Sequence, residues 1–247
     1  MREYTIETYG EKIADDYDMT HPDGPDAAAA ADFLAQRAGA GPALELGIGT
    51  GRVAIPLAAR GVEVHGIDSS PRMIDKLKEK PGGDSITVCI GDMADVAAPG
   101  YGYAVVYITF NTFWYLLTQD DQIRCMRNAV QRLADGGVLV IEGSIPDPAI
   151  MAQGNAVTPF TLSATRVSFD VTVRDPLAQR IDRQNILVDE SGIHLRPMSF
   201  RYIWLAEQDL MARLAGLGLS ERYADWAGTP VTQRSRACIS VYQKAAH

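Results

Sequence analysis

A glycine-rich turn directly after an apolar segment is the feature that most constrains this chain. The run Leu44-Glu45-Leu46-Gly47-Ile48-Gly49-Thr50-Gly51 predicts a short buried strand that enters a tight turn ahead of a helix. Glycine adopts backbone conformations forbidden to other residues and leaves no side chain in the way of a ligand. A second apolar segment, 62–67, ends in Asp68. A glycine turn at one strand end and a carboxylate at the next predict a nucleoside pocket.

The composition is that of a soluble globular protein and narrows the set of partners. The net charge is −8, and the chain contains no cluster of Lys and Arg. Because duplex binding needs such a cluster to displace counterions, we expect no nucleic-acid partner. The apolar stretches are strand-sized, so no membrane span is expected, and the N-terminus lacks the apolar core of a signal peptide. We therefore expect a cytoplasmic protein, and the spacing of the three cysteines predicts no metal site.

Residues 42–143 alternate between apolar strands and helical patterns. Strands are predicted at 43–47, 62–68, 85–91, 103–110 and 137–143, and helices at 51–60, 71–80 and 120–134. This alternation indicates right-handed crossovers and a parallel sheet. Ser70 ahead of Pro71, and Thr118 ahead of the third helix, are the predicted N-caps.

After Pro148 the pattern changes to a period of two. Segments 165–173 and 194–204 alternate polar and apolar residues, as in antiparallel strands with one solvated face. Residues 206–215 then predict a helix, and two last strands follow at roughly 219–226 and 236–243.

Three segments in order resemble the motifs of class I S-adenosylmethionine-dependent methyltransferases. The run from Glu45 to Gly51 is similar to their first motif, acidic-x-Gly-x-Gly-x-Gly. Asp68 matches the acidic end of their second strand, and Gly91-Asp92-Met93 matches the acidic motif after their third. The layout is most similar to that of bacterial small-molecule methyltransferases, some of which modify natural products or sugars.

The resemblance implies a Rossmann-like α/β fold. Its sheet would have seven mostly parallel strands with helices on both faces and a terminal antiparallel hairpin, and an antiparallel β cap would follow the fifth strand. The whole chain, 1–247, would be one methyltransferase domain. Its parts would be an N-terminal arm and helix acting as a lid (1–40), the cofactor-binding core (41–145), the substrate cap (155–205) and the closing helix with the last two strands (206–247).

The resemblance also implies S-adenosylmethionine as cofactor and S-adenosylhomocysteine as product. Asp68 would accept hydrogen bonds from the ribose hydroxyls, and Asp92 would accept one from the adenine amine. The predicted cofactor-binding residues are Tyr17, Glu45, Gly47, Ile48, Gly49, Gly51, Asp68, Ser69, Met73, Asp92, Met93 and Phe110.

Methyl transfer to a small-molecule acceptor is the implied reaction, with oxygen, nitrogen and carbon all open as the methylated atom. The substrate candidates are Asn111, Trp114, Tyr115, Arg166 and Arg201, although the aromatic pair is equally compatible with core packing. An inward-facing arginine pair would indicate an acidic substrate. No catalytic residue is identified. His21 and His194 are candidate bases because histidine titrates near neutral pH, and a non-catalytic surface position is the main alternative for both.

Two other functions compete with the methyltransferase. A nicotinamide-dependent (NAD(P)) oxidoreductase needs glycines spaced G-x-G-x-x-G, and Arg52 stands where the third of these belongs. A non-catalytic S-adenosylmethionine-binding protein would carry the same motifs. The partner expected in every case is a small molecule, and the oligomeric state stays open.

Overall fold

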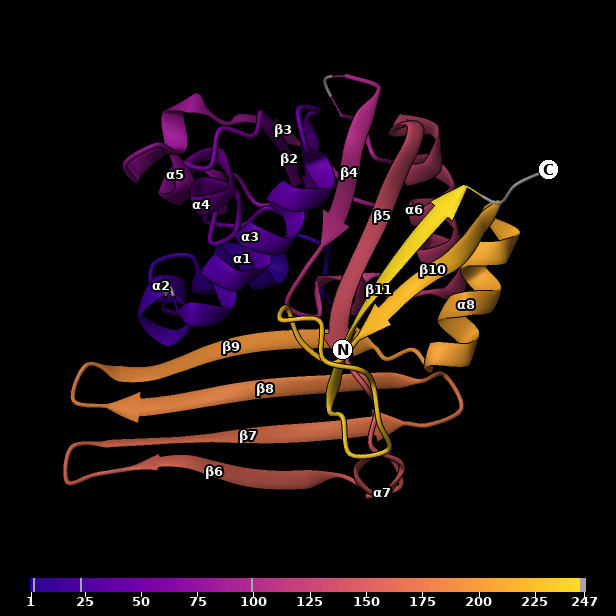
Figure 1. Cartoon of the computed structure of the whole chain (residues 1–247). Coiled ribbons are helices and arrows are strands. Elements are labelled where there is room, and N and C mark those ends of the chain that lie inside the picture. Colours follow the sequence, from indigo (N-terminus) through magenta and orange to yellow (C-terminus); the bar gives the residue numbers. More distant parts are fainter. Residues whose placement is uncertain (2, 23, 99, 245–247) are drawn as a thin grey trace.

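The computed structural model describes residues 1, 3–22, 24–98 and 100–244, which form two β-sheets and their helices (Figure 1). The larger sheet has seven strands in the order β10-β11-β5-β4-β1-β2-β3. Strands β1 to β5 run parallel, and β11 is antiparallel to both β5 and β10. Its strands are β1 Ala43–Leu46, β2 Val64–Asp68, β3 Thr87–Ile90, β4 Tyr103–Ile108, β5 Leu133–Ser144, β10 Leu217–Tyr223 and β11 Ala237–Lys244. The predicted Rossmann-like sheet with its terminal antiparallel hairpin is confirmed.

Helices cover both faces of this sheet because its central strands are apolar on both sides. On one face Leu44 and Val106 belong to a core cluster that includes residues of α6 and α8. On the other face Ala43 and Val105 belong to a cluster that includes residues of α3 and α4. The helices are α3 Pro25–Ala38, α4 Ala54–Ala58, α5 Pro71–Glu79, α6 Gln119–Arg132 and α8 Leu205–Leu214, with short turns at η1 Gly83–Ser85 and η2 Thr112–Tyr115.

Both predicted N-caps are confirmed. The Ser70 hydroxyl accepts a hydrogen bond from the Met73 amide at 3.2 Å, and α5 begins at the following residue, Pro71. The Thr118 hydroxyl accepts one from the Asp121 amide at 3.1 Å, at the start of α6. Each cap satisfies one of the amides left free in the first turn of a helix, so it fixes where the helix starts.

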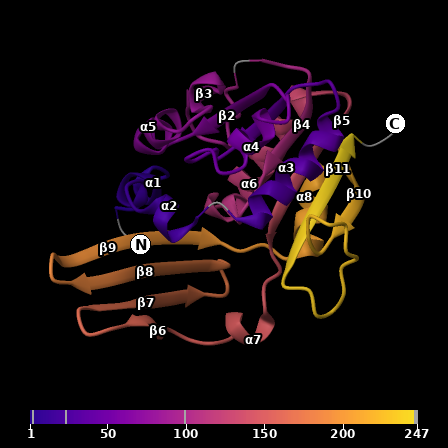
Figure 2. The same ribbon diagram turned by 60° about the vertical axis from the view of Figure 1, so that its left-hand side comes forward.

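An antiparallel sheet follows β5, as predicted, and it has four strands, two of which correspond to the alternating segments at 165–173 and 194–204. It is reached through α7 Pro148–Met151, and its strands β6 Ala156–Leu162, β7 Arg166–Asp175, β8 Arg180–Asp189 and β9 Gly192–Arg201 pair in sequence order. In both ribbon views this second sheet lies past the carboxyl ends of β4 and β5 (Figures 1 and 2). The insertion therefore faces the edge of the large sheet where ligands of this fold class bind.

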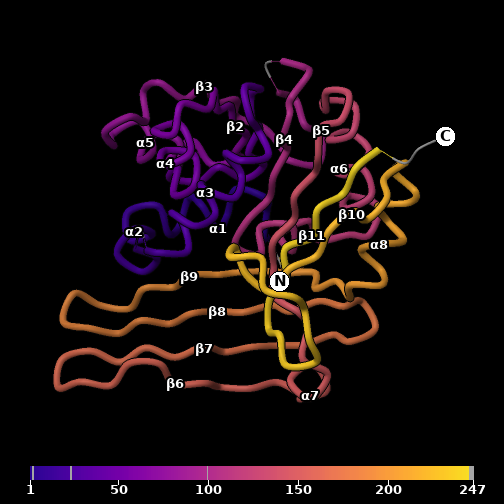
Figure 3. The backbone as a smooth tube through the Cα atoms, in the orientation of Figure 1, coloured from indigo at the N-terminus to yellow at the C-terminus, as the bar shows by residue number. Residues whose placement is uncertain are grey.

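The N-terminal arm lies between the two sheets. It contains two short helices, α1 Thr8–Ile13 and α2 Tyr17–Thr20, and α1 contacts both β9 and α5 (Figure 3). The Ser70 hydroxyl donates to the Glu11 carboxylate at 2.7 Å, and Arg72 donates to the Glu11 carbonyl at 2.9 Å. These bonds fix the arm to the N-terminus of α5.

Several element boundaries differ from the sequence prediction, two of them by several residues. The helix predicted at 51–60 spans only Ala54–Ala58, because Gly51 has φ +79° and still belongs to the turn. The strand predicted at 137–143 begins earlier, at Leu133. Gly136, with φ +76°, lies in an irregularity of this strand, where the pairing with β4 jumps from Leu133 to Val138.

Within the described ranges, no helix has the length and apolar character needed to cross a membrane. The same ranges contain no group of three or more His, Cys, Asp and Glu side chains placed to hold a metal ion. Cys89, Cys125 and Cys238 are free thiols, and the last two are buried.

Candidate functional site

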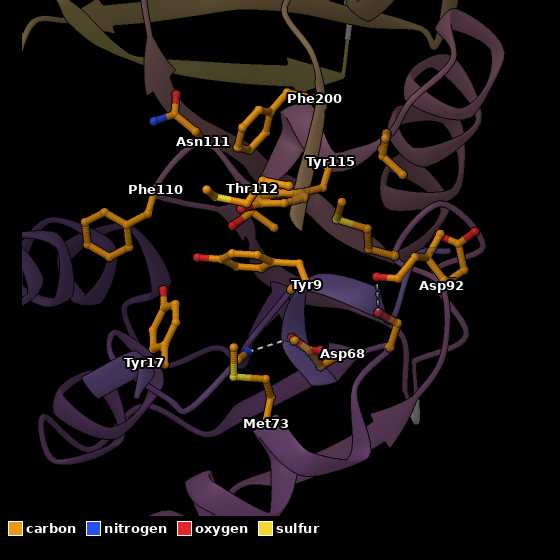
Figure 4. A pocket seen from close by; sticks show the side chains of 18 of the residues that line it. Tyr9, Tyr17, Asp68, Met73, Asp92, Phe110, Asn111, Thr112, Tyr115 and Phe200 are labelled. Carbon is orange, nitrogen blue, oxygen red and sulfur yellow. Dashed lines mark hydrogen bonds between the residues drawn. The ribbon is translucent and has the colours of Figure 1, made fainter. Parts of the chain in front are cut away.

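A cavity of about 290 Å³ lies where the carboxyl ends of β1, β2 and β4 meet the arm and β9 (Figure 4). The large sheet supplies one part of its wall and the arm and second sheet supply the other. Its lining residues are Ile6, Tyr9, Gly10, Tyr17, His21, Gly47, Gly49, Asp68, Ser69, Met73, Asp92, Met93, Phe110, Asn111, Thr112, Tyr115, Leu116, Arg183, Met198 and Phe200.

The glycine turn forms the floor of this cavity. Gly47 and Gly49 have φ values of +78° and +55°, a backbone region that favours glycine. A Cβ on Gly47 would lie 2.3 Å from the Thr112 methyl group, whereas a Cβ on Gly49 would meet no atom within 4 Å. Position 47 therefore requires glycine for both packing and backbone conformation. At Gly49 the missing side chain leaves open space next to the backbone.

Asp68 is tied to the glycine turn by its carboxylate. Its two oxygens accept hydrogen bonds from the Gly49 amide at 2.7 Å and the Ser70 amide at 2.9 Å. Burial raises the pKa of Asp68, and these amide donors oppose that rise. The side chain lines the cavity, so it combines these bonds to the backbone with an accessible position for a ligand.

Asp92 lies at the opposite end of the cavity from Tyr17 and Phe110, with Asp68 between them (Figure 4). One Asp92 oxygen accepts a hydrogen bond from the Ala94 amide at 2.8 Å, which orients the carboxylate at the end of β3. Met73 and Met93 also line the cavity. The segments that carried the family resemblance are thus brought together in one site.

Glu45 lies beneath the site. Its side chain is 3% exposed and is absent from the cavity lining. The Tyr107 hydroxyl donates to it at 3.0 Å and the Thr109 hydroxyl at 3.4 Å. Burial raises the pKa of Glu45 to about 8, against the effect of both donors. Ile48 and Gly51, also predicted to contact a cofactor, are likewise absent from the lining; Gly51 packs against Leu77 instead.

Phe110 and Asn111 hold the mouth of the cavity in an unusual backbone conformation. They have φ values of +54° and +63°, which cost non-glycine residues about 1 kcal/mol each. The Glu142 carboxylate accepts a hydrogen bond from the Phe110 amide, and the Asn111 side chain accepts one from the Ser144 amide at 2.6 Å. The Arg52 guanidinium lies 4.0 Å from the centre of the Phe110 ring. The end of β5 therefore fixes the loop after β4.

Aromatic rings from three distant segments form the wall opposite the glycine turn. The Tyr9 and Tyr115 rings lie 5.0 Å apart, and the Phe200 ring lies 4.9 Å from Tyr115 in an edge-to-face arrangement. Burial raises the pKa of both Tyr9 and Tyr115, so the two phenols are neutral near pH 7. Neither Tyr9 nor Phe200 was singled out for this site from the sequence. The alternation along 194–204 placed Phe200 on one strand face without showing what that face contacts.

The two candidate bases occupy different places. His21 lines the cavity and stacks on Tyr17 with ring centres 4.6 Å apart. Burial lowers the pKa of His21, so its imidazole is neutral near pH 7. His194 lies at the β8–β9 hairpin, where its Nε2 is 2.8 Å from the Ser191 hydroxyl, and it is absent from the cavity lining.

The predicted substrate residues are also divided. Asn111 and Tyr115 line the cavity, whereas Trp114, Arg166 and Arg201 do not. Trp114 packs against Tyr202, and Arg166 pairs with Asp189 at the β8–β9 hairpin. Arg201 is 6% exposed and donates to Gln122 and to Glu207, which joins β9 to α6 and α8. In contrast to Arg166 and Arg201, Arg183 of the second sheet does line the cavity.

Known proteins match this chain in sequence and structure. Residues 43–137 match the family described as Methyltransferase domain. The structure of the CcbJ methyltransferase from Streptomyces caelestis is 43% identical, covers 98% of this chain and 100% of its own, and superposes with a TM-score of 0.92. A cypemycin N-terminal methyltransferase from Streptomyces sp. is 29% identical over 204 residues, 81% of this chain and 82% of its own.

The fold recurs in more distant structures. The sugar N-methyltransferase KedS8 from Streptoalloteichus sp. has a TM-score of 0.67 at 20% identity over 98% of each chain. Nothing among these relatives supports a nicotinamide-dependent oxidoreductase. With its glycine turn, its acidic strand ends and a relative 43% identical over its whole length, the chain belongs to the class I S-adenosylmethionine-dependent methyltransferases.

Proposed function

We propose that this enzyme transfers a methyl group from S-adenosylmethionine to a nitrogen atom of a small natural-product acceptor. The observation that carries the proposal is one cavity joining the glycine turn, Asp68 and Asp92 to an aromatic wall of Tyr9 and Tyr115. The glycine turn and the two acids suit a nucleoside, whereas the aromatic wall suits a sulfonium and an organic acceptor.

The lining residues support one arrangement of the cofactor. Asp68 would accept from the ribose hydroxyls, with Ser69 nearby, and Asp92 would accept from the adenine amine, with Met73 and Met93 against the ring. The methionine portion would extend along the glycine turn toward Tyr17 and Phe110, which lie at the other end of the cavity (Figure 4).

The chemistry needed from the protein is mainly placement. When bound, S-adenosylmethionine would supply the methyl group: the nitrogen lone pair would displace its sulfur, S-adenosylhomocysteine would leave, and the nitrogen would then lose a proton to water. Holding both reactants in one geometry would supply much of the rate, and the rings of Tyr9 and Tyr115 would contribute to binding the sulfonium.

One observation favours nitrogen over oxygen as the methylated atom: burial raises the pKa of Tyr9 and Tyr115, so neither phenol of the aromatic wall is ionised to act as a base near pH 7. His21, which lines the cavity and stacks on Tyr17, is the candidate base for an alcohol acceptor. An alcohol would need a general base near the sulfur, whereas an uncharged amine reacts with its own lone pair. The names of the cypemycin N-terminal methyltransferase and the sugar N-methyltransferase KedS8 are consistent with an amine acceptor.

The test pairs amines with alcohols of the same carbon skeleton. The enzyme is incubated with S-adenosylmethionine and each pair, and S-adenosylhomocysteine release and the methylated product are measured by mass spectrometry. We expect methylation of at least one cyclic amine and none of its alcohol counterpart. Methylation of alcohols in preference to amines would overturn the nitrogen assignment, and failure to bind S-adenosylhomocysteine would overturn the enzyme assignment as a whole.

A further inference from the structure

Arg183 is a cationic residue of the second sheet, and its side chain lines the cavity. The pairing register puts Ile181 opposite Phe200 and Arg183 opposite Met198. Because directly opposed residues point to the same face of a sheet, these four side chains share one face. Arg183, Met198 and Phe200 all line the cavity. The Arg183 guanidinium lies 5.7 Å from the centre of the Phe200 ring, next to the aromatic wall.

A buried carboxylate on the neighbouring strand lies beside Arg183. The Arg183 Nε is 3.3 Å from an oxygen of Asp170, a residue only 4% exposed, but this Nε has no hydrogen-bond partner among the described residues. The other Asp170 oxygen accepts a hydrogen bond from the Asn185 side chain at 2.8 Å. Asp170 therefore balances the charge of Arg183 without accepting a hydrogen bond from its Nε.

The charges around Arg183 are compensated. Asp170 neutralises Arg183, and Asp16 of the arm pairs with Arg196 of β9. A carboxylate entering this part of the cavity would meet these acids as well as the two arginines, which offsets the attraction. An uncharged oxygen gains a hydrogen bond from a guanidinium nitrogen without that repulsion, and bonds to a charged donor are the stronger kind.

We propose that Arg183 is a specificity-determining residue that donates a hydrogen bond to an uncharged hydroxyl of the acceptor, at the end remote from the methylated nitrogen. The inference rests on the proposed function, because it takes the cavity beyond the aromatic wall as the acceptor subsite. Through this hydrogen bond, Arg183 selects amines that also carry hydroxyls over plain amines and over amino acids.

The experiment measures binding to the enzyme saturated with S-adenosylhomocysteine. Three probes share a six-membered ring: a methyl glycoside of an amino-deoxyhexose, cyclohexylamine and 4-aminocyclohexanecarboxylate. Titration calorimetry gives the affinity of each for the wild type and for Arg183→Met, which keeps an unbranched stem and removes the donors. Arg166→Met is the matched control, because Arg166 lies on the same sheet and pairs with Asp189 outside the cavity.

We expect the wild type to bind the hydroxylated amine more tightly than the other two. Arg183→Met weakens that probe by about tenfold or more, the loss of one hydrogen bond from a charged donor, and leaves cyclohexylamine and S-adenosylhomocysteine unchanged. Arg183→Lys restores part of the preference because it keeps a donor. Asp170→Asn leaves Arg183 uncompensated and raises the affinity for the aminocarboxylate. Arg166→Met behaves as the wild type.

Three outcomes overturn the assignment of Arg183. Equal losses for the hydroxylated and plain amines in Arg183→Met would show a structural role only. Tightest wild-type binding of the aminocarboxylate would show that the subsite selects an anion. Binding of none of the three probes by an enzyme that still binds S-adenosylhomocysteine would reject the hydroxylated-amine class while leaving the cofactor site intact. Loss of S-adenosylhomocysteine binding by the wild type would instead reject the proposed function.

Discussion

The two halves of the cavity are built from different parts of the chain. The glycine turn, Asp68 and Asp92 all come from consecutive strand ends of the large sheet, and their side chains are bonded to nearby backbone amides. The aromatic wall takes Tyr9 from the arm, Tyr115 from η2 and Phe200 from β9. The half of the cavity proposed for the cofactor is therefore placed mainly by local sequence, with Tyr17 of the arm as the exception, whereas the half proposed for the acceptor exists only after distant segments have packed together.

The largest effect is expected in the cofactor half from Asp68→Ala. This change removes two hydrogen-bond acceptors for the ribose together with the tie to the Gly49 amide. We expect the affinity for S-adenosylhomocysteine to fall by about 100-fold, since two bonds to a charged group contribute about 3 kcal/mol. Asp75→Ala, an exposed position on α5, is the control. An unchanged affinity in Asp68→Ala would remove Asp68 from the ribose site.

Two partly buried acids, Glu142 on β5 and Glu207 on α8, are expected to respond to pH in opposite directions. Burial raises the pKa of Glu142 to about 7, against the Phe110 amide that donates to it. At Glu207 burial acts in the same direction, but hydrogen bonds from Gln179 and Arg201 outweigh it and lower the pKa. The folded chain therefore binds a proton more tightly than the unfolded chain at Glu142 and less tightly at Glu207.

The two acids therefore change the stability of the fold with pH in opposite directions. Glu142 destabilises the fold as pH rises from 4.5, its ordinary pKa, through about 7, a cost of about 3 kcal/mol that Glu142→Gln removes. Glu207 stabilises the fold above its ordinary pKa and loses that contribution as pH falls through its lowered value. Urea unfolding of the wild type, Glu142→Gln and Glu207→Gln over the acid to neutral range measures both. A Glu142→Gln variant with the pH profile of the wild type would contradict the first sign.

A smaller effect is expected from adding one methyl group to the glycine turn. Gly49 and Gly136 both have positive φ, and neither has an atom within 4 Å of the position where a Cβ would stand. Alanine at either should destabilise the fold by about 1–2 kcal/mol through backbone strain. Only Gly49→Ala also crowds the cavity, so we expect about a tenfold loss of S-adenosylhomocysteine affinity in that variant alone. Equal affinities for both variants would mean that the cofactor does not approach Gly49.

The contrast between locally placed residues and a wall formed by distant segments also explains which features were predictable from the sequence. The alternation of strands and helices, the N-caps and the acidic strand ends depend on neighbouring residues and on periodicity, so they were predictable. Arg201 was a substrate candidate, but strand alternation places it on the face opposite Phe200, where Gln122 and Glu207 enclose it. Periodicity separates the two faces of a strand without telling which one meets the arm. Arg166 shares a face with Arg183, because it lies an even number of residues from Thr172, which pairs with Arg183; periodicity does not tell which of the two reaches the cavity.

The smallest effect should come from the ion pair that joins the arm to the second sheet. Arg196 donates to Asp16 with its side chain 13% exposed. Arg196→Met, Asp16→Asn and the double variant form a cycle, in which we expect a coupling of about 1 kcal/mol in the binding of an amine acceptor. Affinity for S-adenosylhomocysteine should change less than about twofold, because Asp68 and Asp92, the proposed nucleoside contacts, belong to strand ends of the large sheet. Arg60→Met, which breaks an exposed pair with Asp32, controls for lost charge. If the cycle shifted cofactor affinity as strongly as acceptor affinity, the arm would serve both halves, and their separation would not hold.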